Sequence, residues 1–455
     1  MKKLAFILFL FCLNVNSQDI KRKATHGAGL QIVNQQMASN AGIEKPQGLY
    51  VQFVSPNSTL ANINIIAGDI ILSINNIVTN SFEAIRNNPI YEGDYLEYEV
   101  FKDKKIQKFK TKAIGVPFET SEEIKIEYSA FQFQDGYIRS IISKPIENNK
   151  KLPAVLFIPG YPCQSVDNLW LHHPYKKLIY DLTKKGYIVM RAEKPGMGDS
   201  NNSKKCYSID FDTEVESFKA ALADLKKRDD VDPENVFIIG HSMGGMQAPY
   251  VALNNNVKGI ISMGVTIKPP LEYLTEMLRN QNPKLGIDYL QNEKDMRLYE
   301  VLLYELFVNS KKPSELILEN PDYDRILRRD FNYQKDDDFL SRDAIFWQSI
   351  HKKNLIESWA KTTTNVLSAW GESDIQSIND FSHKELVNIV NTYNPNKATF
   401  LELKGTNHNF IKIESLEESY RLAKAGAIGP LLPTHFNYEA VELFHQWMQE
   451  KIANN

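Results

Sequence analysis

The sequence predicts an α/β protein with a doubly wound, mostly parallel sheet, a helical cap insertion, and a small β-rich domain in front. From about residue 118 to residue 455, continuous apolar runs of strand length alternate with helical stretches, as in parallel sheets buried on both faces. Residues 266–362 interrupt this alternation with charged, helical sequence that is too long for a loop, so we expect a cap. Residues 29–117 contain short apolar runs bounded by turn formers, which predicts the β-rich domain.

Length and charge limit the classes of function. The chain has 455 residues, 43% of them hydrophobic and 24% charged, an ordinary globular composition with room for two or three domains. Its 53 basic and 56 acidic residues give a net charge of -3, so we expect neither nucleic acid nor an anionic membrane surface as a partner. The sequence shows no metal-ligand cluster and no phosphate-binding fingerprint, so we expect no metal and no cofactor.

The first residues have the pattern of a secretory signal peptide. A positive start precedes the apolar run from Leu4 to Leu13, and modest side chains lead to a cleavage site near Ser17. A membrane anchor is the alternative, but this run is too short to span a bilayer. We therefore expect residues 1–17 to be removed and the protein to be exported, to the periplasm or the medium. Residues 18–28 are polar, and we expect them to form a disordered linker.

The elements of the small domain follow from the spacing of apolar residues. Residues 48–54 and 69–75 are apolar runs of strand length. Residues 97–114 alternate between apolar and polar on both sides of a short turn, which predicts a hairpin. Residues 81–88 have the spacing of a short helix.

This block resembles a PDZ domain of the kind attached to exported bacterial proteases. The resemblance rests on the stretches GLYV and AGDIILSIN, of which the Gly-Asp-x-Ile part is the strongest. A PDZ domain adds a chain end as a strand and holds its terminal carboxylate with backbone N–H groups. The resemblance implies that Gly48, Leu49, Tyr50 and Val51 form this carboxylate loop for a peptide C-terminus, with Tyr50 in place of the usual second glycine. The alternative is a packing or dimerising module without a ligand.

The larger domain is predicted to begin with a hairpin over residues 125–146 and to continue as alternating strands and helices. The buried strands are expected at residues 154–160, 187–200, 235–240, 257–265, 365–374 and 398–408. Helices are expected at residues 173–185, 212–228 and 243–254, with an amphipathic helix closing the chain at 438–452.

Ser242 has the sequence context of a catalytic nucleophile. The stretch GHSMG follows a buried-strand run and opens a helix, and this strand-to-helix turn is the context that a G-x-S-x-G motif needs. The turn places the nucleophile in a strained conformation and crowds its neighbours, so Gly240 and Gly244 provide room. The alternative is a serine that caps a structural helix.

The chemistry of a serine nucleophile needs an acid and a histidine, in that order along the chain. Asp374 lies at the carboxyl end of the next long strand and is better placed than its neighbour Glu372. His408 follows the last strand, where it would take the Ser242 proton as general base while Asp374 orients its imidazole. Acyl transfer also needs donors for the oxyanion. We expect these to be the backbone N–H groups of Met243 and of Tyr161, the latter on the loop after the strand at 154–160.

From about residue 120 the chain resembles an α/β-hydrolase. The matching stretches are FIPGYP, EKPGMGDS, GHSMGG, WGESD and GTNH, in the order and at the spacing of that family. The resemblance implies hydrolysis through an acyl-serine intermediate, with a small-molecule ester as the favoured substrate. The alternative is a serine peptidase, similar to aminopeptidases or prolyl oligopeptidases, to which the PDZ-like domain presents short peptides. A binding or scaffold protein is a third hypothesis, which the complete triad disfavours.

Two cysteines remain once the signal peptide has left with Cys12. Cys163 lies on the expected oxyanion loop, and Cys206 lies on the loop of the neighbouring strand. Both loops leave the sheet at the same edge, and an even pair of cysteines in an exported chain favours a disulfide over free thiols. We therefore expect a Cys163–Cys206 disulfide at the rim of the active site.

Overall fold

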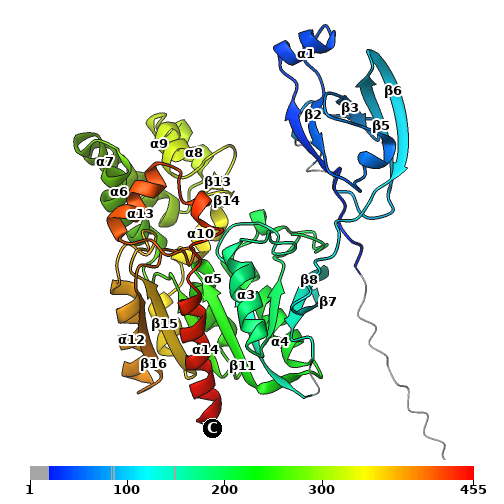
Figure 1. Ribbon diagram of the computed structural model, residues 1–455. Helices are drawn as coiled ribbons and strands as arrows, with labels where there is room; N and C mark the ends of the chain where they lie inside the picture. Colours follow the sequence, from blue (N-terminus) through cyan, green and yellow to red (C-terminus); the bar gives the residue numbers. More distant parts are fainter. Residues whose placement is uncertain (1–19, 83–84, 86–87, 148–149, 455) are drawn as a thin grey trace, which may run out of the picture. The chain divides into compact units, whose positions relative to one another are not determined.

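The computed structural model (Figure 1) describes residues 20–82, 85, 88–147 and 150–454. They belong to two compact units, one formed by Ile20–Glu119 and the other by Thr120–Asn455. The expected signal peptide lies outside the described residues, and the short helix expected at residues 81–88 lies partly outside them.

The smaller unit is an antiparallel sheet with the strand order β1-β2-β3-β5-β6, and β4 pairs with β3. Buried side chains such as Val51, Ile71 and Tyr98 form its core. The expected hairpin is the β5–β6 pair. The elements are β1 (Ala28–Ile32), α1 (Gln35–Ala41), β2 (Leu49–Val54), β3 (Ile70–Ile74), β4 (Ile77–Val78), β5 (Tyr95–Lys102) and β6 (Lys105–Lys112).

From Ile20 onward, the stretch expected to be a disordered linker (residues 18–28) packs into this small unit. Ile20, Arg22 and Ala24 are buried, and the residues between them are more exposed. The Arg22 guanidinium donates a hydrogen bond to the carbonyl oxygen of Val116 at 2.6 Å. Alternate side chains therefore point inward, as in a strand, and the polarity of the stretch concealed this pattern. The expected boundary of the domain is corrected from residue 29 to Ile20.

The larger unit is built on an eight-stranded sheet with the order β16-β15-β12-β11-β9-β10-β8-β7. The first two strands along the chain, β7 and β8, form the expected antiparallel hairpin. The remaining strands of this sheet pair with one another in parallel, and β10 pairs with β8 in the antiparallel direction. The predicted fold class, a doubly wound and mostly parallel sheet, is confirmed. The strands are β7 (Lys125–Phe133), β8 (Gly136–Lys144), β9 (Leu152–Ile158), β10 (Ile188–Ala192), β11 (Val231–His241), β12 (Gly259–Met263), β15 (Asn365–Gly371) and β16 (Ala398–Leu403).

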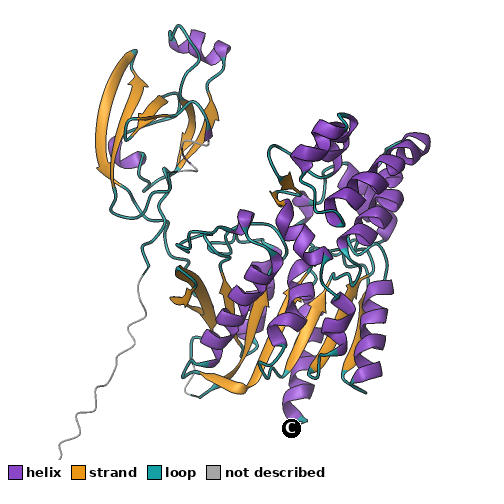
Figure 2. Ribbon diagram, turned by 180° about the vertical axis from the view of Figure 1, so that it is seen from behind, coloured by secondary structure: helices purple, strands orange, loops and turns teal. Residues whose placement is uncertain are grey.

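Helices cover both faces of this sheet because successive side chains of its buried strands point to opposite sides (Figure 2). Leu156 of β9 packs with Phe218 on one face, whereas its neighbour Phe157 packs with Leu178 on the other. The first face carries α4 (Phe211–Lys226), α5 (Met243–Ala252) and α12 (Phe381–Tyr393), and the second carries α3 (Pro174–Lys184) and α14 (Tyr438–Ala453).

A helical insertion between β12 and β15 forms the cap, which lies beyond the carboxyl ends of the strands (Figure 1). Aromatic residues fill its interior, and Phe331 stacks on Phe339 with ring centroids 4.7 Å apart. Among the helices of the described chain, none has the length and the apolar character needed to cross a membrane. The cap elements are α6 (Pro270–Leu285), α7 (Tyr289–Phe307), α8 (Pro313–Glu319), α9 (Asp322–Asp330), β13 (Asp338–Phe339), β14 (Arg342–Asp343), α10 (Ala344–His351) and α11 (Leu355–Ala360).

Candidate active site

Ser242 stands alone between the end of β11 and the start of α5, in a backbone conformation that is strained for a side chain. Its φ is 55° and its ψ is -123°, and its N–H donates to the carbonyl oxygen of Met263 at 2.8 Å. A Cβ at Gly244 would lie 2.1 Å from the Ile158 oxygen, and one at Gly240 would lie 2.3 Å from the Gly244 oxygen. Both flanking glycines are therefore required by the turn that presents the Ser242 hydroxyl.

Asp374 and His408 meet at the carboxyl ends of β15 and β16. The His408 Nδ1 lies 2.8 Å from Asp374 Oδ2, and both residues are buried. The Asp374 carboxylate also accepts hydrogen bonds from the N–H groups of Gln376 and Ser377 and from the Ser377 hydroxyl. Burial alone would raise the pKa of Asp374, but His408 and these hydrogen bonds outweigh it and lower that pKa to about 2. Because the carboxylate is ionised, it favours the His408 tautomer that carries its proton on Nδ1.

This tautomer leaves the Nε2 lone pair of His408 available to accept a proton. Gly264, which follows β12, makes room for the ring, since a Cβ there would lie 2.9 Å from His408 Nδ1 and 3.2 Å from Asp374 Oδ2. We did not single out Gly264 from the sequence, although a glycine directly after a buried strand was a signal that could have indicated it.

His241, the residue before Ser242, connects parts of the site through hydrogen bonds of its buried ring. Burial lowers the pKa of His241 to about 3, so its ring is neutral. Its Nε2 donates to the His408 carbonyl oxygen at 2.7 Å, and its Nδ1 accepts from the Tyr175 hydroxyl at 2.7 Å. That hydroxyl accepts in turn from the Gly160 N–H at 3.3 Å. A chain of hydrogen bonds therefore links the loop after β9 to the main chain of His408, a role that the sequence did not reveal.

Tyr161 and Met243, the residues expected to supply the oxyanion donors, line the same cavity as Ser242. Met243 opens α5, where the first N–H groups of a helix have no partner within the helix. Tyr161 lies on the loop after β9. This loop passes directly beside Ser242, as a Cβ added at Gly160 would lie only 3.6 Å from the Ser242 Cβ. Met243 and the loop that carries Tyr161 therefore both lie beside Ser242.

A cavity of about 400 Å³ joins these groups under the cap. Ser242, His408, Tyr161 and Met243 all line it. Trp347 is also in its wall, and its ring meets that of Tyr161 at 5.3 Å between centroids. The apolar part of the wall includes Met246, Leu274, Met277, Leu340, Trp347 and Ile350.

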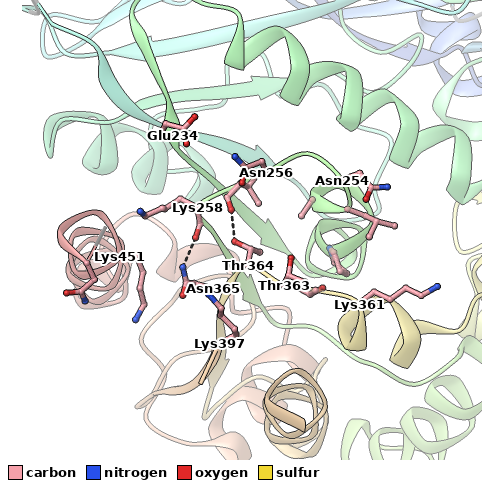
Figure 3. Close-up of a pocket in the computed structure, with 16 residues that line it drawn as sticks. Glu234, Asn254, Asn256, Lys258, Lys361, Thr363, Thr364, Asn365, Lys397 and Lys451 are labelled. Atoms are coloured by element: carbon pink, nitrogen blue, oxygen red, sulfur yellow. Dashed lines mark hydrogen bonds between the residues drawn. The ribbon is translucent and has the colours of Figure 1, made fainter. Parts of the chain in front are cut away.

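A second hollow, of about 1080 Å³, lies at the opposite edge of the sheet, where the parallel strands begin (Figure 3). Its wall is polar, and Thr364 and Asn365 close its floor with hydrogen bonds to the carbonyl oxygens of Val257 and Lys258. It is larger than the cavity beside Ser242, but the carboxyl edge of a parallel sheet is where α/β folds bind their ligands. The candidate active site is therefore the smaller cavity, at the carboxyl edge.

Comparison with known proteins decides the family. The family model described as the alpha/beta hydrolase fold matches residues 153–412, more than half of the chain. The chain belongs to the α/β-hydrolase family. A second family model, described as the PDZ domain, matches residues 17–88. Both resemblances noted in the sequence are therefore confirmed.

This α/β-hydrolase is similar to two curated proteins over part of its length. Esterase EstD of Thermotoga maritima is 30% identical over 142 residues, which are 31% of this chain and 31% of EstD. Dipeptidyl-peptidase 5 of Porphyromonas gingivalis is 27% identical over 116 residues, which are 25% of this chain and 16% of that protein. The chain thus spans less than a third of the length of either relative.

Solved structures are also similar to this chain at low identity. Est1E of Butyrivibrio proteoclasticus with bound ferulic acid is 16% identical, with a TM-score of 0.44, over 71% of this chain and 99% of Est1E. DcsB in complex with a substrate analogue is also 16% identical, with a TM-score of 0.46, over 72% of this chain and all of DcsB (100%).

The PDZ domain of this α/β-hydrolase does not use the carboxylate loop that we expected. The stretch Gly48, Leu49, Tyr50 and Val51 leads into β2, an interior strand that pairs with β1 on one side and with β3 on the other. The Gly48 N–H donates to Asn80 Oδ1 at 2.8 Å. A peptide cannot add to a strand whose two edges are paired, so this assignment is corrected. The edge strand on that side is β1, and strand order could not be predicted from the GLYV motif alone.

The expected disulfide between Cys163 and Cys206 is present, with Cα atoms 5.7 Å apart. It joins the loop after β9, which carries Tyr161, to the short turn after β10. Both sulfur-bearing side chains are buried. The disulfide therefore fixes the rim of the candidate active site and closes a long loop of chain.

Replacing both Cys163 and Cys206 with serine is expected to lower the free energy of unfolding by about 2–5 kcal/mol. The two cysteines are 43 residues apart, so the bond removes considerable freedom from the unfolded chain. Urea denaturation of the two proteins measures the difference. A reductant should bring the wild-type midpoint to that of the variant and leave the variant unchanged, and equal midpoints without reductant would contradict the prediction.

Proposed function

We propose that this α/β-hydrolase is an exported serine hydrolase that cleaves a carboxylic ester through an acyl-serine intermediate. One observation carries the proposal. Ser242, in its strained turn, lines the same cavity as His408, whose Nδ1 is held at 2.8 Å by the buried carboxylate of Asp374. This is the arrangement of nucleophile, base and orienting acid that acyl transfer to a serine requires.

Each residue has one chemical task in this mechanism. His408 Nε2 takes the proton of the Ser242 hydroxyl as the oxygen attacks the ester carbonyl carbon, and the main-chain N–H groups of Tyr161 and Met243 stabilise the resulting oxyanion. The imidazolium then protonates the departing alcohol oxygen, which leaves the acyl group on Ser242. Water, deprotonated by His408, attacks the acyl-enzyme, and the acid departs as the Ser242 oxygen recovers its proton.

The wall of the cavity favours an ester with an apolar acyl group over a free amino acid or a peptide amino terminus. A protonated amine needs an unpaired carboxylate nearby. The wall includes Asp330, but Arg329 already pairs with it at 3.0 Å. The similarity to an esterase over 142 residues supports the same conclusion.

A serine peptidase is the second candidate function. It is favoured by the PDZ domain and by the similarity to a dipeptidyl-peptidase over 116 residues. In that case a peptide C-terminus would add to β1, the edge strand of the small sheet. The disulfide supports export for either function, because such bonds persist in oxidising compartments.

Purified protein is expected to hydrolyse p-nitrophenyl acyl esters with a higher kcat/KM than aminoacyl or prolyl p-nitroanilides. The reason is that the nitrophenol leaves more readily than the nitroaniline, and that Asp330, the carboxylate in the described wall, is already paired with Arg329. A fluorophosphonate probe should label Ser242, as mass spectrometry of the peptides will show. A preference for the anilides would support the peptidase instead, and folded protein without label would contradict both functions.

A further inference from the structure

Three charged side chains with no part in the mechanism above are buried beneath the oxyanion loop. Lys194 lies after β10, Glu214 is on α4, and Arg342 belongs to β14 of the cap, and all three are almost completely shielded from solvent. Glu214 lies 3.0 Å from the Lys194 Nζ and 2.7 Å from an Arg342 nitrogen. Burying three charges is costly, and replacing such groups with apolar ones is often neutral or stabilising. This cluster therefore points to a role other than stability.

Lys194 contacts the peptide group that carries the expected oxyanion donor. Its Nζ donates to the Gly160 carbonyl oxygen at 2.7 Å and to the Tyr161 carbonyl oxygen at 3.1 Å. The Gly160 carbonyl and the Tyr161 N–H belong to one planar trans peptide, so they point in opposite directions. A cation that holds this carbonyl on one side thus directs the N–H to the other.

Arg342, which belongs to the cap, binds the next carbonyl group of the same loop, that of Tyr161. Its Nη1 donates to the Tyr161 oxygen at 3.2 Å, and its Nη2 donates to the Cys206 oxygen at 2.8 Å. The guanidinium also lies over the ring of Phe346, with 3.4 Å between its Cζ and the ring centroid. The cap, the disulfide and the oxyanion loop are therefore joined at one side chain.

Glu214 balances the two cations and connects them to the helix behind the nucleophile. It accepts a hydrogen bond from Gln247 Nε2 on α5 at 2.9 Å. Burial would raise the pKa of Glu214, but Lys194 and Arg342 outweigh it and lower that pKa, so the carboxylate is ionised. Burial also lowers the pKa of Lys194 to about 8, and at neutral pH its ammonium is still charged. The cluster thus keeps a net positive charge behind the loop.

Building on the proposed function, we propose that Lys194 and Arg342 are positioning residues for the oxyanion site: they fix and polarise the Gly160–Tyr161 segment so that the Tyr161 N–H donates to the developing oxyanion. Hydrogen bonds in series polarise one another in a low-dielectric interior, so a cation on the carbonyl strengthens the N–H on the far side of the same peptide. Preorganised donors of this kind act on the transition state and not on bound substrate. Because Arg342 comes from the cap, the oxyanion site depends on the cap being in place.

The test compares wild-type enzyme with Lys194→Met, which removes the charge but keeps an unbranched side chain. The substrate is the p-nitrophenyl ester with the highest wild-type kcat/KM. We expect kcat to fall about 10- to 100-fold, in the range of losing or misplacing one oxyanion donor. The KM should change little, because ground-state binding does not use this N–H.

A pair of inhibitors separates positioning from general loosening of the site. A trifluoromethyl alkyl ketone forms an adduct with Ser242 that carries an oxyanion, whereas the corresponding trifluoromethyl carbinol only occupies the cavity. In Lys194→Met the affinity for the ketone should fall by the same factor as kcat, with carbinol affinity unchanged. Lys194→Arg, which keeps the charge, should recover part of both losses.

Lys144→Met is the matched control, because Lys144 is a mostly buried lysine in ion pairs with Glu127 and Asp230 at the opposite edge of the sheet. It should keep wild-type kcat. If Lys194→Met does not fold, Arg342→Met decides the proposal by the same measurements, since it leaves the Lys194–Glu214 pair in place.

Two results would overturn the inference: kcat and ketone affinity that stay within about twofold of wild type, or equal losses of ketone and carbinol affinity. Wild-type protein without esterase activity would instead overturn the proposed function. The two failures are thus distinguishable.

Discussion

Replacing Ser242 with alanine is expected to lower kcat for ester hydrolysis by about a million-fold, because alanine has no side-chain oxygen that could form the bond to the acyl group. The backbone conformation of the turn, with φ at 55°, is retained, since the two flanking glycines and the hydrogen bond to Met263 remain. The residual rate would come from the oxyanion donors and from substrate binding.

Steady-state kinetics with the best p-nitrophenyl ester measures this loss, and circular dichroism checks the fold. Ser358→Ala is the control, because the Ser358 hydroxyl donates to Leu355 within α11. It should keep full activity and full labelling by a fluorophosphonate. A Ser242→Ala protein that retains more than about a tenth of wild-type kcat would place the nucleophile elsewhere.

Replacing Asp374 with asparagine is expected to lower kcat by about ten-thousand-fold. The Oδ1 of Asp374 accepts two main-chain N–H groups, from Gln376 and Ser377, so the amide oxygen must stay at that position. The amide nitrogen then replaces Oδ2 and faces the Nδ1–H of His408, two donors opposite each other. His408 must move its proton to Nε2, and it can no longer accept the proton of Ser242.

This reasoning is tested by measuring kcat of the Asp374→Asn variant over a range of pH. Glu372→Gln is the matched control, because Glu372 is the neighbouring acid and its carboxylate accepts hydrogen bonds from the Gly405 N–H at 3.0 Å and from the Lys404 ammonium at 3.4 Å. We expect its kcat to stay within about twofold of wild type. An Asp374→Asn variant as active as that control would remove Asp374 from the site, and Glu372 would become the acid to test.

Much of the larger domain could be predicted because its signals are local. A parallel strand buried on both faces is an uninterrupted apolar run, and the carboxyl ends of such strands meet at one edge of the sheet. Once Ser242 was placed at one strand end, Asp374 and His408 could be expected at others. The contact at 2.8 Å between His408 and Asp374 agrees with that expectation.

The small domain shows where local signals end. Strands β2 and β3 were visible as apolar runs and the β5–β6 hairpin as an alternating pattern, but β1 was not expected, and the pairing of strands depends on contacts between distant residues. Thus the stretch from Gly48 to Val51 leads to an interior strand, and β1 takes the edge. The residues from Ile20 to His26 are polar on average, although every second one is buried. The average polarity of a stretch does not show whether buried and exposed side chains alternate along it.

The sequence by itself determined the order of the motifs, the strand ends that carry Ser242, Asp374 and His408, and the pairing of the two cysteines. It could do so because these features depend on runs of residues and on the edge at which parallel strands end. Only the tertiary structure brought Lys194, Glu214 and Arg342 together beneath the oxyanion loop, with Glu214 and Arg342 separated by 128 positions along the chain. Long-range ion pairs leave no periodic trace in the sequence, since they are decided by how the cap packs on the sheet.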